Sequence, residues 1–202
     1  MSASRSNTAT EIRERPFGGI KLLMTVAVSL TINSKCDKVE VCNALETLLV
    51  DARGAERLLP TVAASLWAQG VELRGCPKAC AIVPMEAATE EDWQTEYLAP
   101  ILAVRVVDGV DAAIAHINRY GSGHTDGIVT QSLALADAFV TGVDSASVLV
   151  NASTRLSGGG DYGLGAVVGI STDKLHARGP VGPDELTTYK WVAYGSGHLR
   201  MS

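Results

Sequence analysis

Segments with the pattern of β-strands alternate along this chain with segments that have the pattern of helices. Strands separated by helices of about ten residues are typical of an α/β layered fold with a largely parallel sheet. The expected strands are 46–50, 71–73, 81–83, 101–107, 128–130 and 147–150. The expected helices are 21–35, 110–118 with Asp108 as N-cap, 133–140, and one whose apolar residues recur at helical spacing: Leu58, Leu59, Val62, Ala63, Leu66 and Trp67.

Three segments depart from this alternation. Residues 1–20 are rich in Ser, Thr, Arg and Glu without periodicity, and they predict a loose N-terminal tail before a domain over 21–183. Within that domain, residues 151–183 are rich in Gly, Ser, Asp and Pro, which predicts a long surface loop of the kind that carries function. Residues 184–202 contain Tyr189, Trp191, Val192 and Tyr194, and they predict a terminal strand that pairs with another subunit.

Composition excludes several classes of protein. A chain of 202 residues with 47% hydrophobic and 19% charged residues can bury a substantial core. Its net charge of -5 and its lack of a basic run argue against a nucleic-acid surface. The apolar stretch 22–32 is far shorter than the roughly 20 residues of a membrane-spanning helix, and no secretion signal is evident. We therefore expect a cytoplasmic protein with no membrane contact.

The cysteine spacing predicts neither disulfides nor a metal site. A chain with a good core has little need of disulfides, so the four cysteines, at positions 36, 42, 76 and 80, should be reduced thiols. Cys76 and Cys80 are separated by three residues, whereas zinc ribbons use two, and no second pair is present. Taken alone, Cys42 would also be interpreted as a buried small hydrophobic residue.

Four sequence blocks in a fixed order carry a family resemblance. They are Val41-Cys42-Asn43-Ala44-Leu45-Glu46-Thr47-Leu48-Leu49-Val50, the block 118–125 ending in Gly-His-Thr, the block 150–155 ending in Ser-Thr-Arg, and the block 169–182 around His176. In this order the chain resembles the gamma-glutamyl phosphate reductases, also called glutamate-5-semialdehyde dehydrogenases, of the aldehyde dehydrogenase superfamily. The resemblance runs from about Ala27 to Arg200 and matches the catalytic half of the family's usual polypeptide.

The resemblance implies an architecture and a reaction. It implies an aldehyde dehydrogenase-like catalytic domain with a largely parallel sheet flanked by helices, a C-terminal oligomerisation strand, and an absent nucleotide-binding domain. The implied reaction is the NADPH-dependent reduction of gamma-glutamyl phosphate to glutamate-5-semialdehyde in proline biosynthesis, with release of phosphate. The implied partners are a second copy of the chain, glutamate 5-kinase, or a chain that supplies the nucleotide-binding half.

The resemblance also implies roles for individual residues. Cys42 occupies the position of the catalytic cysteine, which forms a thioester with the substrate and so divides one difficult step into two easier ones. His124 and Arg155 are candidates to hold the substrate's carboxylate or phosphoryl group; the alternatives are a structural His and a surface Arg. Glu96 falls where the superfamily carries a glutamate near the nicotinamide ribose.

A second candidate group lies near the end of the domain. Lys174, His176 and Arg178 alternate, so an extended segment would place them on one side as an anion site; the alternative is a solvated basic face. The family match favours a substrate or structural role near the thiol.

Some positions depart from the family pattern. Val167 replaces a usual Glu, and the approach to Cys42 lacks the usual Gln-Arg-Pro turn and contains Glu40, which would raise the thiol's pKa if it were close. Residues 158–163 fit Gly-x-Gly-x-x-Gly, but no convincing helix follows, so we interpret them as a turn. These departures keep open an alternative function, a non-catalytic homologue that binds or assembles with other chains.

Overall fold

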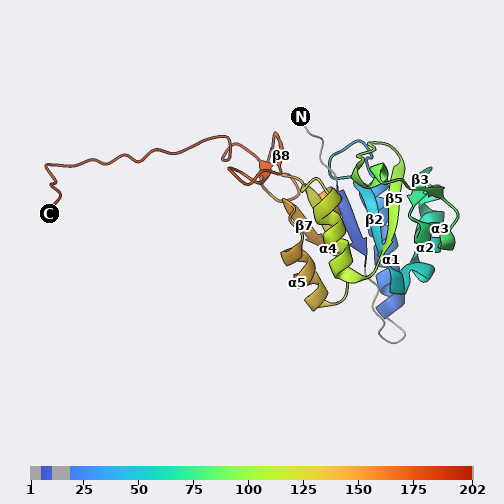
Figure 1. Cartoon of the computed structure of the whole chain (residues 1–202). Helices are drawn as coiled ribbons and strands as arrows, with labels where there is room; N and C mark the ends of the chain where they lie inside the picture. Colours follow the sequence, from blue (N-terminus) through green and yellow to red (C-terminus); the bar gives the residue numbers. More distant parts are fainter. Residues whose placement is uncertain (1–5, 11–18, 202) are drawn as a thin grey trace.

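A parallel sheet of seven strands forms the centre of the computed structural model, which describes residues 6–10 and 19–201 (Figure 1). The strand order is β4-β3-β5-β2-β1-β6-β7, and every pairing is parallel. The strands are β1 (Ser6–Thr10), β2 (Leu45–Asp51), β3 (Glu72–Gly75), β4 (Glu86–Ala87), β5 (Ile101–Val107), β6 (Thr125–Val129) and β7 (Ser147–Val150). The predicted α/β fold with a parallel sheet is confirmed.

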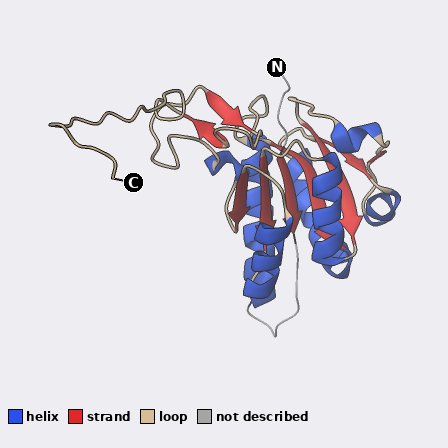
Figure 2. Cartoon of the chain, turned by 60° about the vertical axis from the view of Figure 1, so that its left-hand side comes forward, coloured by secondary structure: helices blue, strands red, loops and turns tan. Residues whose placement is uncertain are grey.

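Helices cover both faces of this sheet (Figures 1 and 2). One face carries α1 (Gly19–Cys36), α2 (Ala52–Trp67) and α3 (Pro77–Ile82), and the other carries α4 (Gly109–Tyr120) and α5 (Leu133–Gly142). The two-residue period of a strand explains the two cores. In β2, Leu48 and Val50 pack with the first group of helices, whereas Leu49 packs with the second.

The N-terminal prediction is wrong for residues 6–10. They form β1, which pairs with β2 on one side and β6 on the other. The sequence Ser-Asn-Thr-Ala-Thr has no apolar run, so its strand conformation depends on the backbone hydrogen bonds of two neighbouring strands. Residues 1–5 and 11–18 of the predicted tail lie outside the described residues, and 19–20 belong to α1.

Two local predictions also change. Residues 81–83 were expected as a strand, but 77–82 form α3, in which Pro77 occupies the first turn, where its fixed φ suits a helix. A short apolar run does not by itself distinguish strand from helix. Asp108 does lie at the N-cap position of α4, but its carboxylate makes no capping hydrogen bond there and instead binds Lys78.

The end of the chain is largely irregular. After β7 come a one-turn 3-10 helix, η2 (Thr154–Leu156), and an antiparallel hairpin of β8 (Gly169–Ser171) and β9 (Gly179–Val181). Another 3-10 helix, η1 (Glu91–Gln94), precedes β5. The predicted long loop over 151–183 is thus confirmed apart from these short elements. Residues 184–201 form no strand within the single chain and lead away from the domain (Figure 1). No described helix is long and apolar enough to span a membrane.

Candidate active site

Cys42 lies in a turn between α1 and β2, on the side of the sheet where β2 and β6 begin. Its side chain is exposed, whereas Cys76 is buried and Cys36 and Cys80 are half-buried. The interpretation of Cys42 as a buried small hydrophobic residue is therefore wrong. An incoming substrate can reach this sulfur from solvent.

Asn43 and Arg155 hold the Cys42 turn in place. The buried Asn43 amide donates to the carbonyl of Ser157 at 2.8 Å and to that of Arg155 at 3.3 Å. In return the Arg155 guanidinium donates to Asn43 Oδ1, and its Nε donates to Asp37 Oδ2 at 2.9 Å. Arg155 is half-buried and binds residues on both sides of the thiol, which does not fit the alternative of a surface Arg.

The segment after β7 reaches the Cys42 turn by folding back over the sheet. Asn151 still lies near the far end of β6, where its side chain bonds both backbone groups of Thr130. The chain then passes α1, where Ser34 Oγ is 3.1 Å from Ser153 Oγ and accepts from Thr154 N at 3.2 Å. These contacts return the chain to the side of the sheet where Cys42 lies.

His124 contacts the segment 151–157 through Thr125. Thr125 Oγ1 donates its one hydrogen to Ser157 Oγ at 2.8 Å. The same oxygen lies 2.7 Å from His124 Nδ1, so in this second bond it must accept and the imidazole Nδ1 must donate. Burial lowers the pKa of His124 to about 4, and the ring is neutral at pH 7. Since its side chain is buried, with 1% of the residue exposed, His124 orients Thr125 rather than facing solvent.

A buried ion pair lies beneath the thiol turn. Lys35 Nζ, at the end of α1, is 2.9 Å from Glu46 Oε2, at the start of β2, and both side chains are almost fully buried. Glu46 Oε1 also accepts from Leu98 N at 3.3 Å. Burial lowers the pKa of Lys35 and raises that of Glu46, while their mutual attraction opposes both shifts. The pair joins α1, β2 and the loop that contains Glu96, whose side chain is half-buried.

The second predicted group, in the β8–β9 hairpin, is organised around one carboxylate. Arg178 Nη2 donates to Asp144 Oδ1 at 2.9 Å, and Lys174 Nζ binds Asp144 Oδ2. These two cations therefore share a partner, but residues 174–176 form a bend rather than an extended segment, and His176 is exposed on it. The residues that lead into β7 pair with the His124 segment, since Ala146 N donates to the Gly123 carbonyl and Ser147 N to the His124 carbonyl. Asp144 precedes them, so its bonds to Lys174 and Arg178 bring the hairpin beside the same segment.

Other sequence features take no part in this site. Cys76 Sγ accepts a hydrogen bond from Val106 N, and no group of described residues has the arrangement of a metal site. Residues 158–163 form turns with no helix after them, as predicted. The sequence analysis missed Lys35, Asn43, Glu46 and Ser157. The sequence feature that could have indicated the ion pair is the lysine at position 35 and the glutamate at position 46, on either side of Cys42.

Comparison with known proteins shows which enzymes this chain is similar to. The aldehyde dehydrogenase family model matches residues 79–164. A gamma-glutamyl phosphate reductase from Caulobacter sp. is 57% identical over 175 residues, which cover 86% of this chain and 42% of that protein. The resemblance to the gamma-glutamyl phosphate reductases is confirmed. The chain spans less than half the length of this relative.

Solved structures give the same result. The gamma-glutamyl phosphate reductase of Thermotoga maritima matches 98% of this chain and 46% of its own, with 44% identity and a TM-score of 0.89. The Saccharomyces cerevisiae enzyme matches 80% of this chain and 39% of its own, with 27% identity and a TM-score of 0.56. An acetylating aldehyde dehydrogenase from Geobacillus thermoglucosidasius, 20% identical over 99% of this chain and 53% of its own, with a TM-score of 0.65, shares the fold.

Removing one member of the buried ion pair should destabilise the protein strongly. Lys35→Met leaves the Glu46 carboxylate buried without its cation, and we expect a loss of about 3–5 kcal/mol in the free energy of unfolding. The double variant Lys35→Met with Glu46→Leu should recover most of that loss. Lys78→Met, which breaks the exposed pair with Asp108, serves as the control and should change it by less than about 1 kcal/mol. Urea unfolding measures the wild type and these three variants, and a double variant no more stable than Lys35→Met would contradict the coupling.

The buried His124 should make stability depend on pH. Its folded pKa of about 4 lies below the ordinary value of 6.5, so below pH 6.5 the unfolded chain binds a proton that the folded chain excludes. The free energy of unfolding should therefore fall as the pH drops from about 6.5 to about 4, by up to about 1.4 kcal/mol per pH unit from this residue. His124→Gln should show a correspondingly shallower slope in urea unfolding between pH 7 and pH 5. Identical slopes would show that His124 is not the group responsible.

Proposed function

We propose that this chain carries the nucleophile of an NADPH-dependent gamma-glutamyl phosphate reductase, which forms glutamate-5-semialdehyde in proline biosynthesis. The observation that carries the proposal is the exposed Cys42 sulfur on a turn fixed by Asn43, Arg155 and Ser157. A nucleophile needs both access and a defined position. The similarity to gamma-glutamyl phosphate reductases over most of the chain supports the choice of substrate.

In the first step Cys42 takes the acyl group. Its thiolate attacks the carbonyl carbon of gamma-glutamyl phosphate, a C–S bond forms, and the bond between that carbon and the phosphate oxygen breaks. Phosphate leaves with the electron pair, and the thiol proton passes to solvent. The product is a glutamyl thioester on Cys42, which is more easily reduced than a carboxylate.

In the second step the thioester carbon is reduced to the aldehyde. NADPH, when bound, supplies the hydride. The carbon–sulfur bond then breaks, the aldehyde leaves, and Cys42 keeps the electron pair as a thiolate. Glu96 is suited to a contact with a ribose hydroxyl of the nucleotide. It is a half-buried carboxylate, and its loop lies beside the thiol turn because Leu98 N donates to Glu46.

The other predicted residues take supporting roles in this scheme. Arg155, which is ion-paired with Asp37, positions the thiol turn and remains the candidate cation for the anionic substrate there. His124 is a positioning residue that acts through Thr125 and Ser157. His176 and Arg178 lie on the hairpin beside the His124 segment and are candidates for the substrate's distal carboxylate.

The complete reaction needs parts that the described chain does not supply. Because the chain spans 42% of the length of its Caulobacter relative, we assign nucleotide binding chiefly to a further segment or partner chain. We also propose glutamate 5-kinase as the source of the unstable acyl phosphate. Residues 184–201 present Tyr189, Trp191 and Tyr194 with exposures of 82%, 92% and 95%, which favours pairing with another copy of the chain. This tail also supports the second candidate function, a non-catalytic assembly module.

Acylation of Cys42 can be tested without the nucleotide. Treatment of the chain with p-nitrophenyl acetate, an activated acyl compound, should release a burst of one p-nitrophenolate per chain and leave an acyl group on Cys42 that peptide mass spectrometry detects. Cys42→Ala should abolish the burst, while the control Cys80→Ala should retain it because Cys80 is half-buried and bonded to the Gly75 carbonyl.

The complete reaction needs a second assay. With the nucleotide-binding part supplied, the phosphate-dependent reduction of NADP+ by glutamate-5-semialdehyde should fall on the order of a thousandfold or more in Cys42→Ala. A wild-type chain that shows no burst, and no turnover with the nucleotide-binding part supplied, would leave the assembly module as the function.

The tail can be tested separately from the chemistry. Replacing Tyr189, Trp191 and Tyr194 with Ser should shift the chain from oligomer to monomer in analytical ultracentrifugation, because these are large exposed apolar groups. The matched control is Leu133→Ser, which changes an exposed apolar residue on α5. A monomeric wild-type chain at all concentrations would contradict assembly through the tail.

A further inference from the structure

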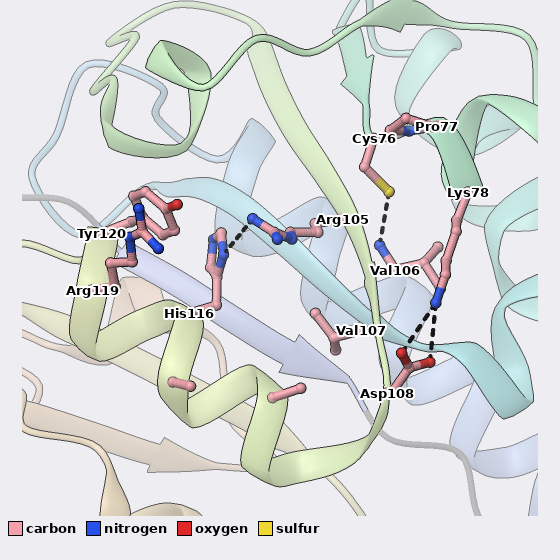
Figure 3. Close-up of a pocket in the computed structure, with 12 residues that line it drawn as sticks. Cys76, Pro77, Lys78, Arg105, Val106, Val107, Asp108, His116, Arg119 and Tyr120 are labelled. Atoms are coloured by element: carbon pink, nitrogen blue, oxygen red, sulfur yellow. Dashed lines mark hydrogen bonds and ion pairs between the residues drawn. The ribbon is translucent and has the colours of Figure 1, made fainter.

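A groove of about 520 Å³ lies between the start of α3, the end of β5 and α4, away from Cys42 (Figure 3). It opens where β3 ends early. The register pairs Gly75, the last residue of β3, with Val104, so the last three residues of β5 have no β3 partner. The Cys42 turn lies at the opposite ends of these parallel strands, and none of its residues lines the groove.

Arg105 is the central charge of this groove. Alternation along β5 directs Arg105 to the α4 face, since Val104 and Val106 belong to the core with α1–α3. There its guanidinium lies 5.2 Å from the centre of the Trp93 ring and donates to His116 Nδ1 at 3.1 Å. Among the described residues Arg105 forms no ion pair, although it is half-buried.

His116 holds Arg105 without neutralising it. Because a guanidinium keeps all its protons, His116 Nδ1 must accept the hydrogen bond, so the imidazole is neutral. Burial, with the nearby Arg105 and Arg119 charges, lowers the pKa of His116 to about 4, although Glu90 opposes this. The positive charge of Arg105 is therefore left uncompensated beside an open groove.

Two further cations border the same groove. Lys78, from α3, is 3.1 Å from Asp108, and Arg119, from α4, is 3.7 Å from Glu90. Both pairs are exposed, and exposed pairs rearrange easily. The groove lining thus contains three permanent cations and one carboxylate, in a chain whose net charge is -5.

We propose that this groove binds a phosphoryl group, either as inorganic phosphate or on a small phosphate ester. A planar guanidinium with unused donors is suited to a phosphate oxygen pair. The cations come from three separate elements, so an anion with oxygens in several directions can meet more than one of them. The exposed Asp108 and Glu90 pairs open to release Lys78 and Arg119 toward the ligand.

The test is a titration of the 202-residue chain, at constant ionic strength in chloride, with inorganic phosphate and separately with glycerol phosphate. The His116 ring resonance, assigned with His116→Gln, reports binding by NMR and should shift saturably. Arg105→Gln should weaken binding by about tenfold or more, since a charge-assisted hydrogen bond is lost. The control Arg200→Gln removes the same charge from the exposed tail and should leave the affinity unchanged.

Several outcomes separate the possibilities. Tighter binding of the ester assigns the site to a phosphorylated metabolite, and equal or weaker binding assigns it to inorganic phosphate. If circular dichroism shows that Arg105→Gln is unfolded, the exposed double variant Lys78→Gln with Arg119→Gln replaces it and should also weaken binding. The proposal is overturned by a shift that does not saturate, by equal affinity in wild type and groove variants, or by an equal loss in Arg200→Gln.

Discussion

The buried ion pair between Lys35 and Glu46 is the interaction on which the arrangement around Cys42 depends. It lies where α1 ends and β2 begins, so it fixes both ends of the turn that carries the sulfur. The second oxygen of Glu46 binds the loop of Leu98 and so adds the Glu96 segment to the same point. Two buried charges are unfavourable unless each is fully partnered. Replacing one member of the pair alone would therefore leave an unpaired buried charge and destabilise the turn.

Polar contacts from distant parts of the chain complete the site around that pair. Residues 151–157 leave the sheet at the end of β7 and fold back past Ser34 to Asn43 and Thr125. As a result the block 150–155, the His124 segment and the cysteine block meet, although more than a hundred residues separate Asn43 from Ser157. The roles in this cluster divide between one exposed cysteine, the proposed nucleophile, and several buried residues that orient its turn.

The two ends of the sheet carry different chemistry. The thiol turn and the His124 segment precede β2 and β6, whereas the groove around Arg105 lies where β3 and β5 end. Sites in open parallel sheets usually lie at the carboxyl ends of strands, so the groove occupies the common position and Cys42 does not. The early end of β3 creates the groove, because it leaves the last residues of β5 without a neighbour on that side.

The sequence by itself determined the layered α/β fold and most helices and strands, because periodicity is a local property, and its family resemblance pointed to Cys42 as the candidate nucleophile. It could not place β1, since Ser6–Thr10 has no apolar pattern and becomes a strand only between β2 and β6. Nor could it show that His124 is buried behind Thr125 or that Arg155 binds Asn43 and Asp37. Only the tertiary structure decided these roles, because burial and hydrogen-bond partners arise from segments that are far apart along the chain.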